Sequence, residues 1–230
     1  SHAASPDEAG PLIEQSQVRG GLVVHLGCGK GELTRSLRIN SRYQVHGLDR
    51  NARHIDSARK MLLAEGVYGQ VTASRLAGEE LPLIDGLVNL LIVDEAQGIP
   101  GNEMLRVLAA QGVLMTRGPK GWTRHQKPRP RDIDDWTHYL HDSSGNAVAH
   151  DAQVGPPRHM QWVGSPRWSR HHDRMASLSA MVSGGGRLFY IMDEGSRVSI
   201  QLPPDWKLVA RDAFNGTILW NQQLSYCHSH

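Results

Sequence analysis

The chain has 230 residues, of which 39% are hydrophobic and 21% charged, and its formal net charge at pH 7 is +2. This length allows one large or two small domains with a buried core, and the composition excludes a chain that is disordered throughout. The small net charge does not favour a nucleic-acid-binding protein. No apolar run is long enough to cross a membrane, and the two cysteines, Cys28 and Cys227, form neither a disulfide framework nor a zinc pattern.

Both ends of the sequence suggest a piece cut from a longer protein. Residues 1–6 are small and begin without methionine, as after a signal cleavage site, although a tag remnant or a fragment edge fits equally well. Residues 226–230 directly follow a predicted strand, with no turn or cap. We therefore expect truncation at both ends, and export from the cytoplasm stays an open alternative.

Strands and helices alternate over residues 20–121, after a polar lead-in at 1–19 that holds at most a short helix. Continuous apolar runs favour buried parallel strands, and apolar residues three or four apart favour helices between them. This order predicts a doubly wound α/β sheet. The predicted strands are 22–26, 43–49, 71–76, 87–93 and 112–116, and the predicted helices are 30–39, 51–66 and 102–110.

The first strand runs directly into a turn that contains Gly27, Gly29 and Gly31. Such a turn between a strand and a helix lets the backbone approach a nucleoside or a phosphate. It is not a dinucleotide fingerprint, which would have a glycine at the position of Glu32. It is also not a P-loop, which would contain Gly-Lys-Ser or Gly-Lys-Thr. Asp49 ends the next strand, where a carboxylate can accept hydrogen bonds from both hydroxyls of a ribose. The alternative is that Asp49 only caps the helix that begins near Asn51.

These features, over residues 20–118, resemble the class I S-adenosylmethionine (SAM)-dependent methyltransferases, whose first motif is a hydrophobic strand followed by Gly-Cys-Gly-x-Gly. The resemblance also covers residues 79–83, 104–108 and 112–115. It implies that SAM is the cofactor and that Asp94, at the end of the fourth strand, is the best single candidate for a catalytic residue. The residues that it implies for cofactor binding are Gly27, Cys28, Gly29, Gly31 and Asp49.

Three residues depart from the family's pattern. His25 stands where the first strand usually carries an acid, Ala77 where an acid commonly binds the adenine amino group, and Asn89 where the fourth strand usually has an acid. The family also continues past the fifth strand with a helix and two further strands. We therefore expect a Rossmann-like fold that lacks its last strands, and both cofactor binding and a purely structural role stay open.

Residues 122–135 are rich in proline and positive charge, which predicts a linker. Proline opposes helix formation and favours an extended chain. A solvated connector is the expectation, and binding of phosphate or nucleic acid is the alternative.

Residues 136–230 differ in character, because turn residues become frequent and helical spacing disappears. Four strands are predicted, at 178–182, 187–192, 206–211 and 217–224. The last two are joined by Asn215-Gly216, and Asn-Gly is among the strongest short hairpin signals. Four successive strands with tight turns form one blade of a β-propeller.

The last hairpin resembles the tryptophan-docking repeat of the pyrroloquinoline quinone (PQQ)-type β-propellers. Residues 135–139 and 142–148 resemble the opening segment of the same propellers, and 159–163 would supply an outer strand. The resemblance implies an all-β partial propeller, PQQ binding only if further blades complete the site, and an extracytoplasmic location. The matching residues of the repeat are Ala210, Asp212, Gly216 and Trp220.

Several histidines lie between residues 138 and 172, and His138, His141 and Asp142 are close in sequence. Their spacing matches no zinc module, and the region has the composition of a loop. We therefore predict no metal site and expect these histidines to be packed or on the surface.

Three functions are compatible with these patterns. The first is a SAM-dependent methyltransferase domain attached to a propeller, which positions the cofactor against an unknown small-molecule or protein substrate. The second is a non-enzymatic propeller scaffold with a degenerate Rossmann-like domain, and the third is a quinoprotein oxidoreductase. Export would weaken the first, because SAM is made in the cytoplasm.

Overall fold

The computed structural model describes residues 5–153, 160–166, 178–199 and 201–225. The chain divides into two compact units, Ser1–Arg129 and Pro130–His230. Among the described helices, none has the length and apolar character needed to cross a membrane.

The first unit is built on a six-stranded sheet with the strand order β3-β2-β1-β4-β5-β6. The first five strands are parallel, and β6 is antiparallel to β5. The central strands β1 and β4 are almost fully buried, as parallel strands are when helices cover both faces of the sheet. The strands are β1 (Gly21–Leu26), β2 (Tyr43–Asp49), β3 (Val71–Arg75), β4 (Val88–Val93), β5 (Leu108–Gly118) and β6 (Gly121–Gln126).

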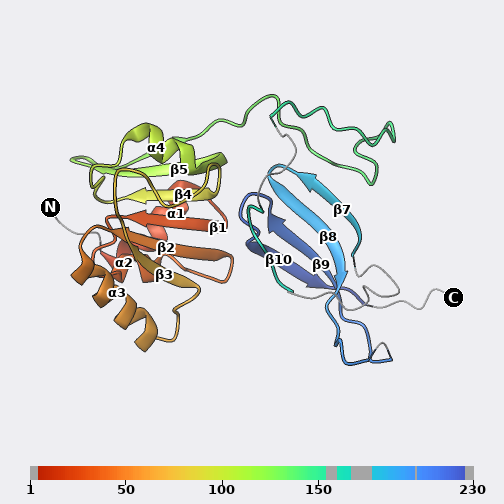
Figure 1. The fold of residues 1–230 in the computed structure, drawn as a ribbon, viewed down its shortest axis with the longest axis horizontal. Coiled ribbons are helices and arrows are strands. Elements are labelled where there is room, and N and C mark those ends of the chain that lie inside the picture. Colours follow the sequence, from red (N-terminus) through yellow and green to blue (C-terminus); the bar gives the residue numbers. More distant parts are fainter. Residues whose placement is uncertain (1–4, 154–159, 167–177, 200, 226–230) are drawn as a thin grey trace. The chain divides into compact units, whose positions relative to one another are not determined.

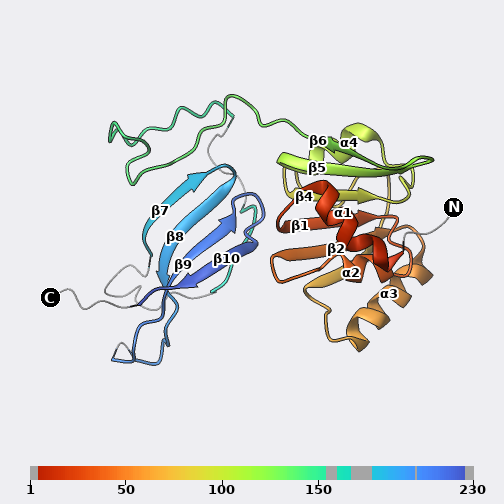
Figure 2. The same ribbon diagram turned by 180° about the vertical axis from the view of Figure 1, so that it is seen from behind.

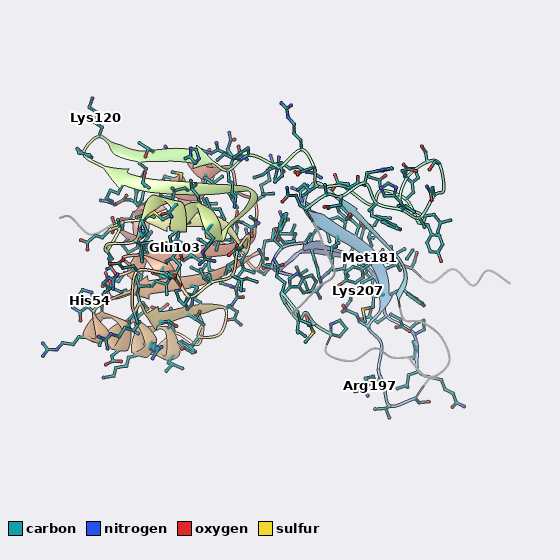
Figure 3. All side chains as sticks on the ribbon, turned by 45° about the horizontal axis from the view of Figure 1, so that its top comes forward. His54, Glu103, Lys120, Met181, Arg197 and Lys207 are labelled. Atoms are coloured by element: carbon teal, nitrogen blue, oxygen red, sulfur yellow. The ribbon has the colours of Figure 1, made fainter. Side chains whose placement is uncertain are left out.

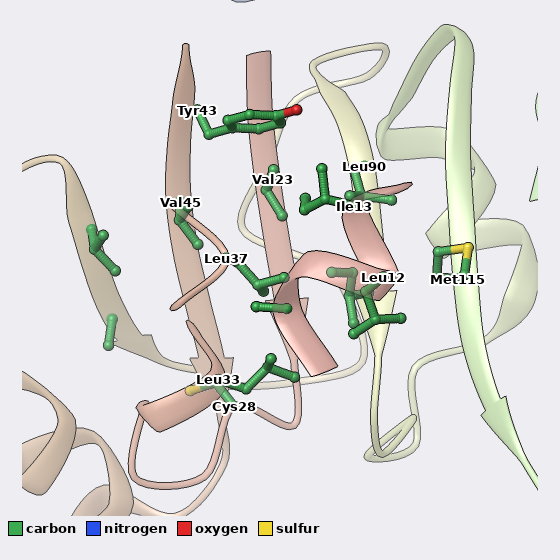
Figure 4. Packing of buried hydrophobic residues seen from close by; sticks show 14 of the residues in the cluster. Leu12, Ile13, Val23, Cys28, Leu33, Leu37, Tyr43, Val45, Leu90 and Met115 are labelled. Atoms are coloured by element: carbon green, nitrogen blue, oxygen red, sulfur yellow. The ribbon is translucent and has the colours of Figure 1, made fainter. Parts of the chain in front are cut away.

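Helices on both faces give this unit two apolar cores. On one face, α1 and α2 lie in front of the sheet in Figure 2, and residues of α3 join the same core. On the other face, α4 lies in front of the sheet in Figure 1 and packs through Met104 and Val107. Figure 4 shows the first core, in which Leu12 of α1 lies among residues from the sheet such as Val23 and Met115. The helices are η1 (Pro6–Glu8), α1 (Ala9–Ser16), α2 (Glu32–Ser36), α3 (Ala52–Ala64) and α4 (Gly101–Val107).

The expected lead-in at 1–19 is wrong in one respect, because α1 is part of the core. Leu12 and Ile13 are only 1% and 5% exposed. The Tyr43 hydroxyl donates a hydrogen bond to the Val18 carbonyl at 2.9 Å, which holds the end of this segment against β2. The helix is therefore structural rather than a polar approach to the first strand.

The predicted linker is wrong at its start, because residues 121–126 form strand β6. The strand pairs with β5 from Gly118↔Gly121 to Val113↔Gln126. Side chains also tie it to α1, since Arg124 Nε donates to the Ser16 carbonyl at 3.0 Å. The prolines that oppose regular pairing come only after the strand has ended. The sheet thus gains one antiparallel strand through a tight hairpin, instead of ending at the fifth strand.

The predicted helix at 102–110 ends earlier than expected. Leu108 has an extended backbone and begins β5, so that Val88 of β4 pairs with it. Before this helix, the segment after β3 is fixed by Glu103 of α4, which is labelled in Figure 3. Its carboxylate accepts the Leu81 N–H at 2.7 Å and is bound by Arg106, whose hydrogen bond is the main cause of its lowered pKa.

The second unit contains a four-stranded antiparallel sheet in the order β10-β9-β8-β7, which is compatible with the predicted all-β character. In the last hairpin, Asp212 Oδ1 accepts the N–H groups of Phe214 and Asn215 at 2.9 and 3.1 Å, and Gly216 has φ +72°. One such sheet is compatible with a propeller blade, but a propeller is not shown. The strands are β7 (Leu178–Gly184), β8 (Arg187–Asp193), β9 (Trp206–Asp212) and β10 (Ile218–Gln223), and Figure 3 labels Met181 on β7 and Lys207 on β9.

The outer strand expected at 159–163 is wrong for residues 160–163, and His159 lies outside the described residues. Trp162 packs against the last hairpin instead, and its Nε1 donates to the Ala213 carbonyl at 3.0 Å. A side chain at Gly216 would overlap the indole ring, with a Cβ only 2.3 Å from it. The tryptophan therefore covers the hairpin turn rather than extending the sheet.

Candidate functional site

The candidate site lies where the strand order of the first sheet reverses. β1 and β4 are neighbours, and the chain runs outward from them to β3 on one side and to β5 on the other. Ligands of doubly wound sheets bind at the carboxyl ends of the strands at such a point. The predicted residues converge here, because residues 27–31 follow β1, Asp49 ends β2 and Asp94 follows β4.

The three glycines of the turn have different reasons to be glycine. All have positive φ, of +77°, +53° and +90° for Gly27, Gly29 and Gly31. A Cβ on Gly27 would lie 2.8 Å from the Glu95 nitrogen, and one on Gly31 would lie 2.8 Å from the Cβ of Ala58 on α3. A Cβ on Gly29 would meet nothing within 4 Å. Packing therefore requires two of the glycines, while Gly29 leaves its face of the turn open.

Asp49 is only 3% exposed and is bound to the glycine turn. Its Oδ2 accepts the Gly29 N–H at 3.0 Å, and its Oδ1 accepts the Asn51 N–H at 2.7 Å. The N-cap of α3 is Asn51, whose side chain accepts the Arg53 N–H at 3.0 Å, so the capping role considered for Asp49 belongs to Asn51. Each carboxylate oxygen of Asp49 has a further lone pair for a ligand hydroxyl.

His25, which replaces the family's acid, is 1% exposed at the end of β1. Its Nδ1 lies 2.8 Å from the Thr34 hydroxyl on α2, and its buried Nε2 has no hydrogen-bond partner among the described residues. Burial is the main cause that lowers the pKa of His25 to about 4, while Asp49 raises it and Arg117 lowers it further. The imidazole is therefore neutral at pH 7 and carries one nitrogen that the protein does not satisfy.

The other singled-out residues serve packing or lie apart. The Cys28 side chain is 5% exposed in the core, and burial is the main cause that raises the pKa of its thiol to about 12. Only the backbone of Cys28 lies in the glycine turn. The Asn89 side chain accepts the Leu22 N–H at 2.8 Å, and Ala77 is exposed after β3.

No sequence pattern indicated a role for Arg50, which follows Asp49 and joins two other loops. Its Nη2 donates to the Gly78 carbonyl after β3, and its Nε donates to the Gln97 carbonyl after β4, both at 2.6 Å. The Arg50 N–H also donates to Gln97 Oε1 at 2.9 Å. The three loops that border the site are thus linked by one guanidinium.

Asp94 is part of a charged network that sequence reasoning also missed. Its Oδ1 lies 2.7 Å from Arg117 Nε on β5. The Arg117 Nη2 also donates to both oxygens of Glu8, at 2.8 and 2.7 Å, and Trp122 Nε1 donates to Glu8 Oε2 at 2.8 Å. The hydrogen bond from Trp122 is the main cause of the lowered pKa of Glu8. This network fixes η1 against β5 and β6 beside the candidate site.

A family model for a methyltransferase domain matches residues 23–112. This segment has a Rossmann-like, methyltransferase-type fold. The match contains the glycine turn, Asp49 and Asp94, but it covers less than half of the 230 residues and none of the second unit. Among curated proteins, no match to the chain is found.

Several solved structures are similar to the first unit. A Methanococcus maripaludis protein, described as a candidate SAM-dependent methyltransferase, is 18% identical with a TM-score of 0.45, over 49% of this chain and 54% of that one. YcgJ from Bacillus subtilis is 19% identical with a TM-score of 0.42, over 48% and 49%. Geranyl diphosphate C-methyltransferase from Streptomyces coelicolor A3(2), in complex with Mg²⁺, geranyl diphosphate and S-adenosyl-L-homocysteine, is 18% identical with a TM-score of 0.43, over 48% and 44%. The chain spans about half the length of these proteins.

Proposed function

We propose that the first unit binds SAM and transfers its methyl group to an unidentified acceptor. The observation that carries the proposal is the open backbone at Gly29, hydrogen-bonded to the buried carboxylate of Asp49 within the segment that matches the methyltransferase model. The Streptomyces coelicolor enzyme, whose structure contains S-adenosyl-L-homocysteine, adds support for the cofactor class. The match does not favour a purely structural scaffold.

The residues of the site fit the chemistry of this cofactor. SAM supplies a methyl group on a sulfonium, and the part of the protein is to hold donor and acceptor in line. Asp49 has lone pairs for the ribose hydroxyls. In the tautomer in which Nδ1 of His25 donates to the Thr34 hydroxyl, its unpartnered Nε2 can accept a hydrogen bond from the amino group at the methionine end. The guanidinium of Arg50 is held at its edges by the carbonyls of Gly78 and Gln97, so that its planar face is suited to stack on a purine.

Calorimetry on the full chain with SAM and with S-adenosyl-L-homocysteine tests cofactor binding. Asp49→Ala should weaken binding at least tenfold, because it removes a charged acceptor of two hydroxyls; about 1.4 kcal/mol corresponds to a factor of ten. Asp56→Ala, at an exposed position on α3, is the matched control and should leave the affinity unchanged. Absence of binding at millimolar cofactor would refute the proposal, and circular dichroism shows whether a variant has lost its fold.

For Asp94, we propose a role in accepting a proton from the methyl acceptor, a step that contributes typically 10²–10⁴-fold. The ion pair with Arg117 supports a second role, in which Asp94 only holds that side chain. Asp94→Asn should lower turnover about a hundredfold without changing cofactor affinity if Asp94 takes the proton. If Glu8→Gln, which weakens the other side of the same network, has an equal effect, Asp94 is a positioning residue.

We propose that the second unit is one blade of a PQQ-like propeller. Ala210 is fully buried, Asp212 and Gly216 form the hairpin turn, and Trp220 on β10 is 39% exposed with its ring 6.1 Å from that of Phe189. In a complete propeller the next blade would cover this tryptophan. The reading frame that encodes the chain should therefore contain further tryptophan-docking repeats, and a frame without them contradicts the proposal. Quinone binding and an extracytoplasmic location depend on the same result.

A further inference from the structure

Histidine and carboxylate side chains converge in the second unit, in the segment that precedes β7. His141, Asp142 and His150 each offer one ligand atom, and these atoms all lie within 4.8 Å of one another. Between residues 134 and 150 there is no helix or strand, apart from an isolated bridge between His138 and His141. The cluster is therefore formed by loop conformation.

His141 is the buried member of the cluster. It is 3% exposed and has φ +72°, in the left-handed region that non-glycine residues rarely adopt. Its Nε2 lies 2.6 Å from Asp134 Oδ2. A carboxylate only accepts hydrogen bonds, so Nε2 carries the proton and Nδ1 of the neutral ring carries a lone pair.

The Nδ1 atom of His141 is buried and has no hydrogen-bond partner among the described residues. It lies 3.5 Å from Asp142 Oδ2, which is also an acceptor. The His150 ring is next to it, with the two ring centroids 5.3 Å apart. Potential ligand atoms of three side chains thus lie within 4.8 Å of one another, and a positive charge among them would turn the repulsion between their lone pairs into attraction.

Asp134 orients this cluster from outside it. Besides the His141 ring, its Oδ2 accepts the backbone N–H of His150 at 2.7 Å, so that one carboxylate oxygen positions both histidines. These two hydrogen bonds, with that of His150 the larger cause, lower the pKa of Asp134 to about 2. A histidine that binds a metal usually donates its other ring N–H to such a carboxylate, which fixes its tautomer.

We propose that His141 Nδ1, Asp142 and His150 bind a divalent transition-metal ion of the zinc type, with Asp134 as the positioning residue. Two imidazoles and one carboxylate suit Zn²⁺ and its neighbours in the first transition row, whereas Ca²⁺ and Mg²⁺ prefer oxygen ligands alone. Three protein ligands leave a coordination position open for water or a small ligand. The sequence prediction of no metal site fails under this proposal, because the ligands are brought together by backbone geometry and not by module spacing.

The loop that carries the cluster is attached to the sheet at Trp136. The Trp136 N–H donates to Ser183 Oγ at 2.8 Å, and its carbonyl accepts the Ser183 N–H of β7 at 2.7 Å. The Trp136 ring packs edge-on against His141, with centroids 5.3 Å apart. Since metal binding contributes free energy to the folded arrangement of its ligands, zinc should slow amide exchange over residues 134–150.

Zinc competition against a chromophoric chelator, with the full chain, tests the site. We expect one bound ion, and absorption bands of the Co²⁺ form that report its nitrogen and oxygen ligands. Cys227, His228 and His230 are replaced in every sample, because this Cys-His-x-His end of the sequence is itself a potential metal ligand set. His141→Ala and Asp142→Asn should each weaken binding at least tenfold, and Asp134→Asn about 10–100-fold, the range for outer-shell partners.

The matched control is His138→Gln, which removes an exposed histidine of the same loop that is hydrogen-bonded to Thr137. It should leave zinc affinity unchanged. His150→Gln guards against local unfolding, because His150 is exposed and His141 is not. Equal zinc affinity of the parent chain, with only Cys227, His228 and His230 replaced, and of its His141→Ala and His150→Gln variants would overturn the proposal.

Discussion

Two buried histidines, His25 in β1 and His141 in the loop before β7, have one satisfied and one unsatisfied ring nitrogen each. The satisfied nitrogen of His25 meets the Thr34 hydroxyl, and the charges that act on its ring are of opposite sign, from Asp49 and Arg117. The satisfied nitrogen of His141 meets one carboxylate, and the other nitrogen lies 3.5 Å from a second. An imidazole near charges of both signs, as at His25, is suited to a polar ligand atom. An imidazole between two carboxylates, as at His141, is suited to a cation.

The two units also differ in how their sheets are covered. The sheet of the first unit is packed on both faces, and 0% of Met115 on β5 is exposed. On β7 of the second unit, Met181 is 46% exposed. The first unit therefore has a core packed on both faces of its sheet, whereas Met181 on the sheet of the second unit is about half exposed to water.

The largest expected effect separates these two methionines. Met115→Ala should destabilise the first unit by about 2–5 kcal/mol, because it leaves a cavity in a packed core. Met181→Ala should cost less than about 1 kcal/mol, since half of the side chain is already in water. Native-state hydrogen exchange of the amides in β5 and in β8 measures both. An equal cost for Met181 would show that its face is covered in solution, by a second copy or by further blades.

The next largest effect is the loss of folding stability at low pH that the buried His25 causes. His25 takes up a proton at its usual pKa near 6.5 when unfolded, but only at about 4 when folded. Between these pH values the unfolded state binds more protons than the folded state. The contribution of His25 to the free energy of unfolding is therefore fully present above pH 6.5, and up to about 3 kcal/mol is lost as the pH falls towards 4.

Urea unfolding at pH 7.5 and pH 4.5 measures this loss, with fluorotryptophan at Trp122 as the probe, because it is the only tryptophan in residues 1–129. His25→Gln should remove most of the pH dependence. The control is His46→Gln on β2, whose pKa is also lowered, mainly by burial, but whose side chain is less completely buried. A pH dependence that persists in His25→Gln would place its origin elsewhere.

Local patterns predicted the first unit well, and contacts between distant segments account for what they missed. Strand 43–49 and the glycine turn follow from apolar runs and glycine spacing within a few residues. The residues of β6 have no apolar alternation, and the strand forms because β5 pairs with it and α1 binds Arg124. Likewise Arg50 acts through carbonyls 28 and 47 positions away, which no local pattern encodes.

The same distinction explains the site and the cluster in the second unit. The position of Asp49 at the end of β2 could be predicted, because the end of a strand is a local feature of the sequence. Glu8 could not, because its partners Arg117 and Trp122 lie more than 100 residues away. His141 and His150 are closer in sequence, but their approach depends on a left-handed backbone at His141 and on Asp134, neither of which composition predicts.

The smallest expected effect compares two cations of nearly equal exposure, Arg117 at 23% and Lys207 at 24%. Arg117 joins Glu8 to Asp94, and its Cζ lies 4.8 Å from the centroid of the Trp122 ring, whereas Lys207 lies between Glu194 and Asp205, at 2.9 and 3.0 Å. Arg117→Met should lower the free energy of unfolding by about 1–2 kcal/mol, because it removes the stacking and the several directed hydrogen bonds of a planar guanidinium. Lys207→Met should lower it by less than about 1 kcal/mol, because it removes only a partly screened charge pair.

The exchange of one cation for the other gives the control for this pair. Arg117→Lys should recover less than half of the lost stability, since an ammonium cannot reproduce the fork or the stacking, while Lys207→Arg should be close to neutral. Amide exchange in β5 and β9 is measured at low salt and at about 0.5 M NaCl, where exposed charges are strongly screened. The difference separates the contribution of charge to stability from that of hydrogen-bond geometry. If Arg117→Lys is as stable as the unsubstituted chain, charge alone holds η1 against the sheet, and the network beside Asp94 has no geometric role.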